Sequence, residues 1–301
     1  MSAPRGANRW LAVLPTAWLL IFFALPFLIV FKLSFSQPTD TRPPYKPVFD
    51  AAAGAANWLE AAKDFTFEAY ANLFSDSLYL ESYLSSLKVA AVATLFALLI
   101  GYPIAYAMSR APKRWRPALI ALAIAPFWTS FLIRVYAWVM ILKDEGLLNA
   151  ALLSLGLISE PLKIYATQTA VIIGIVYSYL PFMILPIYAA LEKQEGTLVE
   201  AAMDLGATPV RAFWSITAPL SKRGVIAGCL LVFIPATGEF VIPDLLGSSD
   251  VLMIGSTLWE EFFTARNWPG AAAVAVMLLL ILIVPLMVYE KSQMKETEAR
   301  R

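Results

Sequence analysis

Long apolar stretches constrain this sequence more than any other feature. Several of them reach about 20 residues, and a helix that rises about 1.5 Å per residue needs about that many to cross roughly 30 Å of hydrocarbon. The composition agrees, because 59% of the 301 residues are hydrophobic and only 15% are charged. A soluble domain is about a quarter charged. The sequence therefore predicts an all-α, polytopic membrane protein with six transmembrane helices.

The six spans form one transmembrane domain over residues 1–301. By hydropathy they lie at about residues 10–34, 84–108, 118–142, 168–190, 224–246 and 271–289. The first apolar run is too long for a signal peptide and has no convincing cleavage site, so it is expected to stay as a span. A long loop at 35–83 carries seven acids against three bases. Its end, from Phe65 to Leu87, predicts one or two short helices that lead into the second span.

The basic residues of the short loops predict the orientation. The 143–167 loop has two bases and three acids, whereas the 110–117 loop has no acid and carries Arg110, Lys113, Arg114 and Arg116. By the positive-inside rule the basic loop is cytoplasmic and the acidic loop is external. Six spans then place both termini in the cytoplasm.

Several residue types are missing that other functions require. The chain has no His and one Cys, Cys229, so internal disulfides are excluded and no metal site is predicted. It also lacks the G-x-x-x-x-G-K-[ST] loop that binds nucleotide phosphates. A net charge of +1 gives no field that would attract nucleic acid. We therefore expect no cofactor on this chain, and any nucleotide chemistry requires a partner.

One polar segment, "EAAMDLGATPVRAFWSITAPL" from Glu200 to Leu220, interrupts the apolar pattern. It lies in the 191–223 loop, which the alternation of spans places in the cytoplasm. Thr197 and Glu200 fit a capping box, which predicts a helix that starts at Thr197 and carries its acids on one face. Gly206 suits a left-handed C-terminal cap.

A second short helix should follow in the same loop. Pro209 suits the first helical turn, with Thr208 as its N-cap, and this helix runs towards the fifth span. Two turns of helix are unstable alone in water, so the first helix must pack on something. By physics alone, an amphipathic helix lying on the lipid surface explains the pattern as well as a helix docked on a partner protein.

The spacing in this loop resembles the EAA loop of ABC importer permeases. The matching residues are Glu200, Ala201, Ala202, Gly206, Ile216 and Pro219. In that family the short helix docks into a cleft on an ATPase subunit. The resemblance therefore implies that contact with the ATPase is made by Glu200, Ala201, Ala202, Asp204, Leu205 and Gly206.

Other stretches resemble the permeases of bacterial polyamine importers, the putrescine and spermidine group. They are "WTSFLIRVYAW" at 128–138, "GIVYSYLPFMILPIY" at 174–188 and "GEFVIPDLLG" at 238–247. The resemblance implies a type I ABC importer permease fold in the bacterial inner membrane. It also implies a second related permease, two ATPase subunits that use ATP and Mg²⁺, and a periplasmic binding protein.

Three ionisable residues fall inside expected spans, where a charge costs several kcal/mol and is functional or paired. They are Arg134, Glu239 and Asp244. One interpretation is an ion pair between Arg134 and Glu239 that locks two helices. The other places Glu239 on the substrate path, where its carboxylate meets an ammonium group and Asp244 offers a second one. Aromatic rings attract cations, so further path candidates are Trp128, Tyr136 and Tyr177.

Prolines and glycines predict how the spans bend and pack. Pro235 and Pro243 should distort the helix around Glu239, and "YLPFMILP" should do the same in the fourth span. Gly224 and Gly228 form a small-xxx-small pair that predicts close helix packing. Alternative functions are an ABC permease for another small solute, a secondary cation carrier that uses the acids for ion coupling, and a membrane scaffold or channel subunit.

Overall fold

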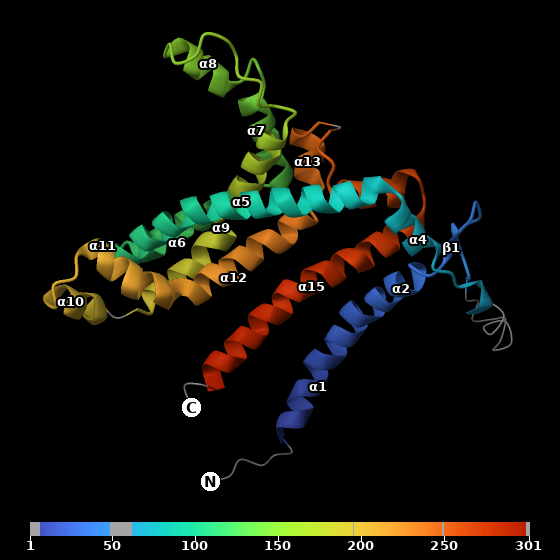
Figure 1. Ribbon diagram of the computed structural model, residues 1–301, viewed down its shortest axis with the longest axis horizontal. Helices are drawn as coiled ribbons and strands as arrows, with labels where there is room; N and C mark the ends of the chain where they lie inside the picture. Colours follow the sequence, from blue (N-terminus) through green and yellow to red (C-terminus); the bar gives the residue numbers. More distant parts are fainter. Residues whose placement is uncertain (1–6, 49–61, 195, 249, 299–301) are drawn as a thin grey trace. The chain divides into compact units, whose positions relative to one another are not determined.

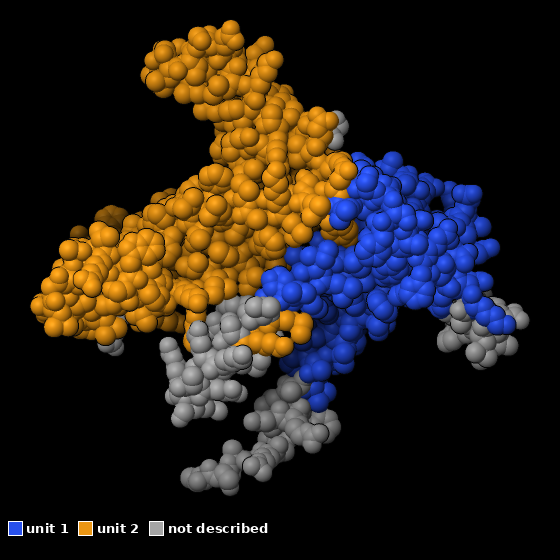
Figure 2. All heavy atoms as spheres, viewed as in Figure 1, with its two compact units in different colours: residues 1–80, 257–285 blue, residues 81–256, 286–301 orange. Residues whose placement is uncertain are grey.

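The computed structural model describes residues 7–48, 62–194, 196–248 and 250–298. The chain divides into two compact units (Figure 2). Unit 1 comprises residues 1–80 and 257–285, and unit 2 comprises residues 81–256 and 286–301. Within the described residues, five helices are long and apolar enough to cross a membrane, or six if one bent pair forms a single span. This agrees with the six predicted spans.

Unit 1 begins with one long apolar helix. It consists of α1 (Ala7–Leu19), the π-helical turn η1 (Leu20–Ala24) and α2 (Leu25–Leu33). Most of the large apolar side chains of this helix are exposed, as expected for a helix that faces lipid. The elements that follow are β1 (Gln37–Pro38), β2 (Tyr45–Lys46), η3 (Ala62–Asp64) and α4 (Glu68–Ser75). Strands β1 and β2 pair antiparallel.

The second long helix, α5 (Ser77–Arg110), starts earlier than the expected boundary at residue 84. Its first residues lie in unit 1, where the Tyr79 hydroxyl donates to Glu261 Oε1 at 2.7 Å. Glu261 belongs to the π-helical η6 (Glu260–Thr264), which follows α14 (Ile254–Trp259). The last span is α15 (Trp268–Glu298), whose Trp268 stacks on Phe262 with ring centroids 5.1 Å apart.

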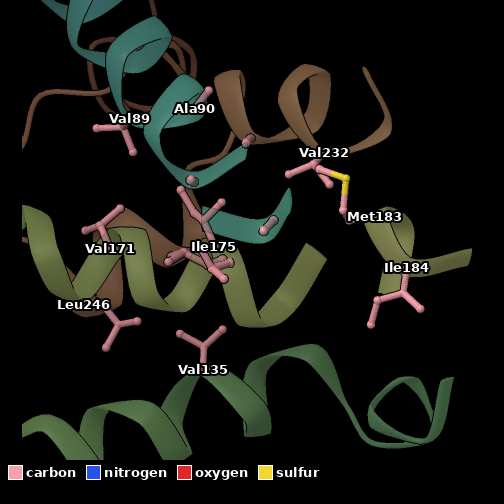
Figure 3. Packing of buried hydrophobic residues seen from close by; sticks show 14 of the residues in the cluster. Val89, Ala90, Val135, Val171, Ile175, Met183, Ile184, Val232 and Leu246 are labelled. Atoms are coloured by element: carbon pink, nitrogen blue, oxygen red, sulfur yellow. The ribbon is translucent and has the colours of Figure 1, made fainter. Parts of the chain in front are cut away.

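Helix α9 (Gln168–Glu192) forms the centre of unit 2. It runs as one helix through Pro181 and Pro186, so neither proline breaks it, although the sequence predicted a distortion there. The buried side chains of Val171 and Ile175 lie between neighbouring helices and meet the core around Val135 (Figure 3). Because apolar residues occupy several faces of α9, dense packing stabilises the helix despite the two missing backbone donors.

Helix α12 (Ala218–Thr237) packs closely along α9 (Figure 1). A Cβ at Gly224 would lie 2.6 Å from the Ala190 Cβ and from the Pro186 carbonyl oxygen. One at Gly228 would lie 2.9 Å from the sulfur of Met183. The predicted close packing at the two glycines is therefore confirmed.

The expected span at 118–142 is broken into two helical parts. Helix α6 (Arg116–Ile124) continues as the 3-10 turn η4 (Ala125–Trp128), and the chain then becomes extended at Thr129. Helices α7 (Phe131–Leu142) and α8 (Leu147–Ser154) follow, and the two halves are bent by 86° at this break (Figure 1). Pro126 lacks a backbone donor, which favours an end to the helical hydrogen bonding here.

The expected span at 224–246 is also two helices. A continuous helix runs from Pro209 to Thr237 and comprises α11 (Pro209–Ala212), the π-helical η5 (Phe213–Thr217) and α12. The chain then breaks at residues 238–240 before α13 (Val241–Leu246). The break lies between Pro235 and Pro243, as the sequence predicted.

Candidate functional site

The first candidate site is the 191–223 loop, which lies at one end of α9 and α12 (Figure 1). Its first helix, α10, spans Gly196–Asp204, so Thr197 is the second helical residue rather than the N-cap that the capping box predicted. The helix ends as expected. Gly206 has φ +87°, its N–H donates to Met203 O at 2.9 Å, and the Ala207 N–H donates to Ala202 O at 3.0 Å.

The second helix of the loop is capped as the sequence predicted. The hydroxyl oxygen of Thr208 accepts the Arg211 N–H at 3.3 Å, and Pro209 occupies the first helical position. Helix α11 and the turn η5 run without interruption into α12, so the second helix of the loop and the membrane span are one continuous helix. The loop is thus joined directly to a membrane span.

The side chains of α10 are available to a partner. Within the described residues the helix buries none of its side chains, and Glu200, Ala201 and Asp204 are exposed. Leu205, which follows the helix, is 89% exposed, and Trp214 in η5 is 69% exposed. Leu205 therefore leaves an exposed apolar group next to the acids of a helix too short to be stable alone, a combination that suits contact with a partner protein or with the lipid surface.

The second candidate site is the break between α12 and α13, which contains Glu239. This residue is only 8% exposed. Its Oε1 accepts the backbone N–H groups of Val241 at 3.0 Å and of Ile242 at 3.4 Å. Its Oε2 accepts the hydroxyl of Tyr179 from α9. The carboxylate thus caps the N-terminus of α13 and links it to α9.

Arg134 lies in α7 and is 9% exposed, but it does not pair with Glu239. Its Nε and Nη1 atoms are buried and have no hydrogen-bond partner. The guanidinium carbon lies 5.3 Å from the centre of the Phe127 ring and 5.7 Å from that of Phe131. The ion pair that the sequence suggested is therefore absent, because the Glu239 oxygens accept other donors and the arginine is held by aromatic faces.

A row of aromatic rings lies between the two buried charges. Phe127 packs against Phe182 with centroids 5.2 Å apart, and Phe182 packs against Tyr179 at 6.1 Å. Arg134 is therefore at one end of the row, over Phe127, and Glu239 is at the other end, on Tyr179. Sequence reasoning did not single out Phe182, because an aromatic residue in an apolar span gives no distinguishing signal.

The Glu239 carboxylate makes its hydrogen bonds with Tyr179, Val241 and Ile242, and none of them involves the other path candidates. Asp244 is exposed on α13, Trp128 is exposed in η4, and Tyr136 is exposed on α7. Tyr177 is half-buried and packs edge-to-face on Trp138 at 5.4 Å. No group of three or more potential metal-binding side chains occurs in the part of the chain that the structure describes.

A family model and individual known sequences that resemble this chain indicate the same family. The family model for the binding-protein-dependent transport system inner membrane component matches residues 1–289. The spermidine/putrescine transport system permease protein PotB of Haemophilus influenzae is 41% identical over 276 residues, which cover 92% of this chain and 90% of that protein. PotB of Escherichia coli is 41% identical over 272 residues, which cover 90% of this chain and 92% of that protein.

A solved structure shares the fold. It is a bacterial alginate ABC transporter in complex with an alginate pentasaccharide-bound periplasmic protein. One of its chains matches with a TM-score of 0.69 at 16% identity, over 95% of this chain and 93% of that one. At this identity the match concerns architecture, which is that of an ABC importer permease.

Proposed function

This chain belongs to the family of binding-protein-dependent transport system inner membrane components, and we propose that it is the permease subunit of an ATP-driven importer of polyamines. It is a membrane transport subunit rather than an enzyme. The curated relatives that cover nine-tenths of the chain carry spermidine and putrescine in their names, which supports the substrate class.

The observation that carries the importer proposal is the exposed helix, turn and helix of the 191–223 loop. Its α10 presents Glu200, Asp204 and Leu205 to solvent. Its second helix continues into α12 as one rod. This arrangement suits a loop that a separate ATPase displaces. Gly206 forms the turn between α10, which the ATPase would bind, and the continuous helix from α11 to α12.

The partners follow from this role. A second, related permease completes the substrate path. Two ATPase subunits bind ATP and Mg²⁺ and contact the coupling loops. A periplasmic protein delivers the substrate. Closure of the ATPase dimer pulls α10, and α12 passes the movement to the break at Glu239. The basic 110–117 loop supports an orientation with this side, and both termini, in the cytoplasm.

The substrate chemistry rests on Glu239 and its neighbours. A polyamine is a chain of methylene groups with ammonium groups along it, so a carboxylate next to aromatic rings matches both parts. Tyr179 supplies such a ring at Glu239, and Phe182 packs against Tyr179. We place Glu239 on the path as the residue that meets an ammonium group, in competition with the Tyr179 hydroxyl. Trp128, Tyr136, Tyr177 and Asp244 are secondary candidates.

The test is reconstitution of the complete complex in lipid vesicles. Labelled putrescine and spermidine should accumulate only with external binding protein and ATP on the motor side. An amino acid and an alginate oligosaccharide serve as matched controls. Uptake driven by an ion gradient without ATP would instead identify a secondary carrier. Uptake of a control solute in place of the polyamines would identify an ABC permease for another solute.

A further inference from the structure

One guanidinium group joins the ends of three helices beside the coupling loop. Arg116, the first residue of α6, donates from Nη2 to Ser109 O at 2.8 Å and from Nε to Ala111 O at 3.0 Å, both at the end of α5. Its Nη1 lies 3.3 Å from Oε1 of Glu192, the last residue of α9. The last carbonyls of a helix lack partners within the helix, and a cation there is favourable.

Geometry matters more than charge in this arrangement. The side chains of Arg116 and Glu192 are 22% and 44% exposed, and a half-exposed ion pair contributes little by itself. The planar guanidinium, however, bonds acceptors in three directions at once, which a lysine ammonium on a flexible stem does not reproduce. Tyr188 adds a further bond, since its hydroxyl donates to Glu192 Oε1 at 2.7 Å.

Arg116 and Glu192 also line a cavity of about 270 Å³ beside the coupling loop. Gly196 and Val199 of α10 and Ile216 of η5 contribute to the same lining. At the base of the loop, Gln194 Nε2 donates to Thr217 O at 3.2 Å. Helix α10 buries no side chain of its own among the described residues and packs on α11 and η5, so the cavity is where it comes near Arg116 and Glu192.

We propose that Arg116 is a positioning residue for energy coupling, which makes the ends of α5, α6 and α9 respond as one body when α10 is displaced. The inference rests on the proposed function, since it assumes a motor that moves α10. Without the three-way contact, α9 still follows α12, on which it packs, but the ends of α5 and α6 no longer follow. ATP hydrolysis then continues while fewer substrate molecules are carried per ATP.

The experiment measures polyamine uptake per ATP hydrolysed in vesicles that contain the whole transporter. The variants are Arg116→Gln and Arg116→Lys, and the control is Arg114→Gln, which removes one positive charge from an exposed position in the same loop. We expect Arg116→Gln to lower the number of polyamine molecules carried per ATP at least about fivefold. This factor corresponds to the lower end of the typical range of coupling free energies between two sites. The uptake per ATP of Arg116→Lys should lie between that of Arg116→Gln and that of the wild type. The uptake per ATP of Arg114→Gln should equal that of the wild type.

The outcomes separate this inference from the proposed function. If the wild-type complex shows no ATP-driven uptake, the proposed function fails. If it transports but Arg116→Gln keeps the wild-type ratio, or Arg114→Gln lowers the ratio equally, the positioning role is wrong. Should Arg116→Gln fail to assemble, Arg116→Lys decides the matter, because an assembled lysine variant with the wild-type ratio also overturns the role.

Discussion

Tyr179 donates its hydroxyl to Oε2 of Glu239, and so joins the central helix α9 to the break between α12 and α13. Glu239 Oε1 meanwhile accepts two backbone N–H groups of α13. The carboxylate is therefore both a helix cap and a negative charge in the membrane domain. Two substitutions distinguish these roles, because the cap needs an oxygen acceptor whereas attraction of an ammonium group needs the charge.

Glu239→Gln should impair transport and leave folding intact. The amide oxygen can still cap α13, but the negative charge is lost, so initial polyamine uptake should fall at least about tenfold, equivalent to about 1.4 kcal/mol. Glu239→Ala removes the cap as well and should also cost about 1 kcal/mol of stability. Uptake and thermal unfolding are measured on the same preparations. Wild-type uptake by the glutamine variant would remove Glu239 from the path.

Arg134→Met should stabilise the isolated chain in detergent. Two buried nitrogens of Arg134 lack partners, and each buried donor without a partner costs about 1–3 kcal/mol. Methionine keeps much of the length without the charge, so the apparent melting temperature should rise. Arg211→Met, at an exposed position, should change it little. A decrease of about 3–5 kcal/mol in the free energy of unfolding would instead indicate that Arg134 takes part in a buried ion pair, which this structure does not contain.

Glu200→Lys should release the ATPase. The substitution reverses a charge on exposed α10, and the amount of ATPase that co-purifies should fall at least about tenfold, or about 1.4 kcal/mol. Glu160→Lys, an equally exposed acid in the 143–167 loop, is the matched control and should retain the ATPase. An intact and normally coupled Glu200→Lys complex would contradict docking through α10.

Gly224→Val should separate α12 from α9. The first added carbon would lie 2.6 Å from Ala190 and from the Pro186 carbonyl oxygen, and overpacking of this kind costs about 1–3 kcal/mol or more. The apparent melting temperature in detergent should fall accordingly. Ala227→Val, at a half-buried position of the same helix, should have a smaller effect. Equal effects of both variants would mean that the close approach at Gly224 does not limit stability.

Much of the architecture could be predicted because span length and turn chemistry are local properties. The permease fold and the all-α class are confirmed. The turn at Gly206 and the cap at Thr208 were also found correctly, since a left-handed glycine and a capping hydroxyl act within a few residues. The same holds for the packing at Gly224, which requires only that a neighbouring helix approach it.

The failures concern tertiary contacts, which decide whether a proline breaks a helix and which partner a buried charge meets. Helix α9 continues through Pro181 and Pro186 because packing holds it on several sides. The chain turns by 86° after Pro126, within the segment for which hydropathy predicted a single span at 118–142. Likewise, the sequence suggested an ion pair between Arg134 and Glu239, but only the folded chain shows that Tyr179 and backbone donors hold the acid.

The 29-residue rod from Pro209 to Thr237 is roughly 43 Å long at the usual helical rise. Glu239 lies just beyond one end of it and the coupling turn lies at the other. Angular phase along such a rod is fixed, because each residue advances the helix by about 100°. A single inserted residue would thus rotate one end against the other by more than a quarter turn, although every side chain on both ends would still be present.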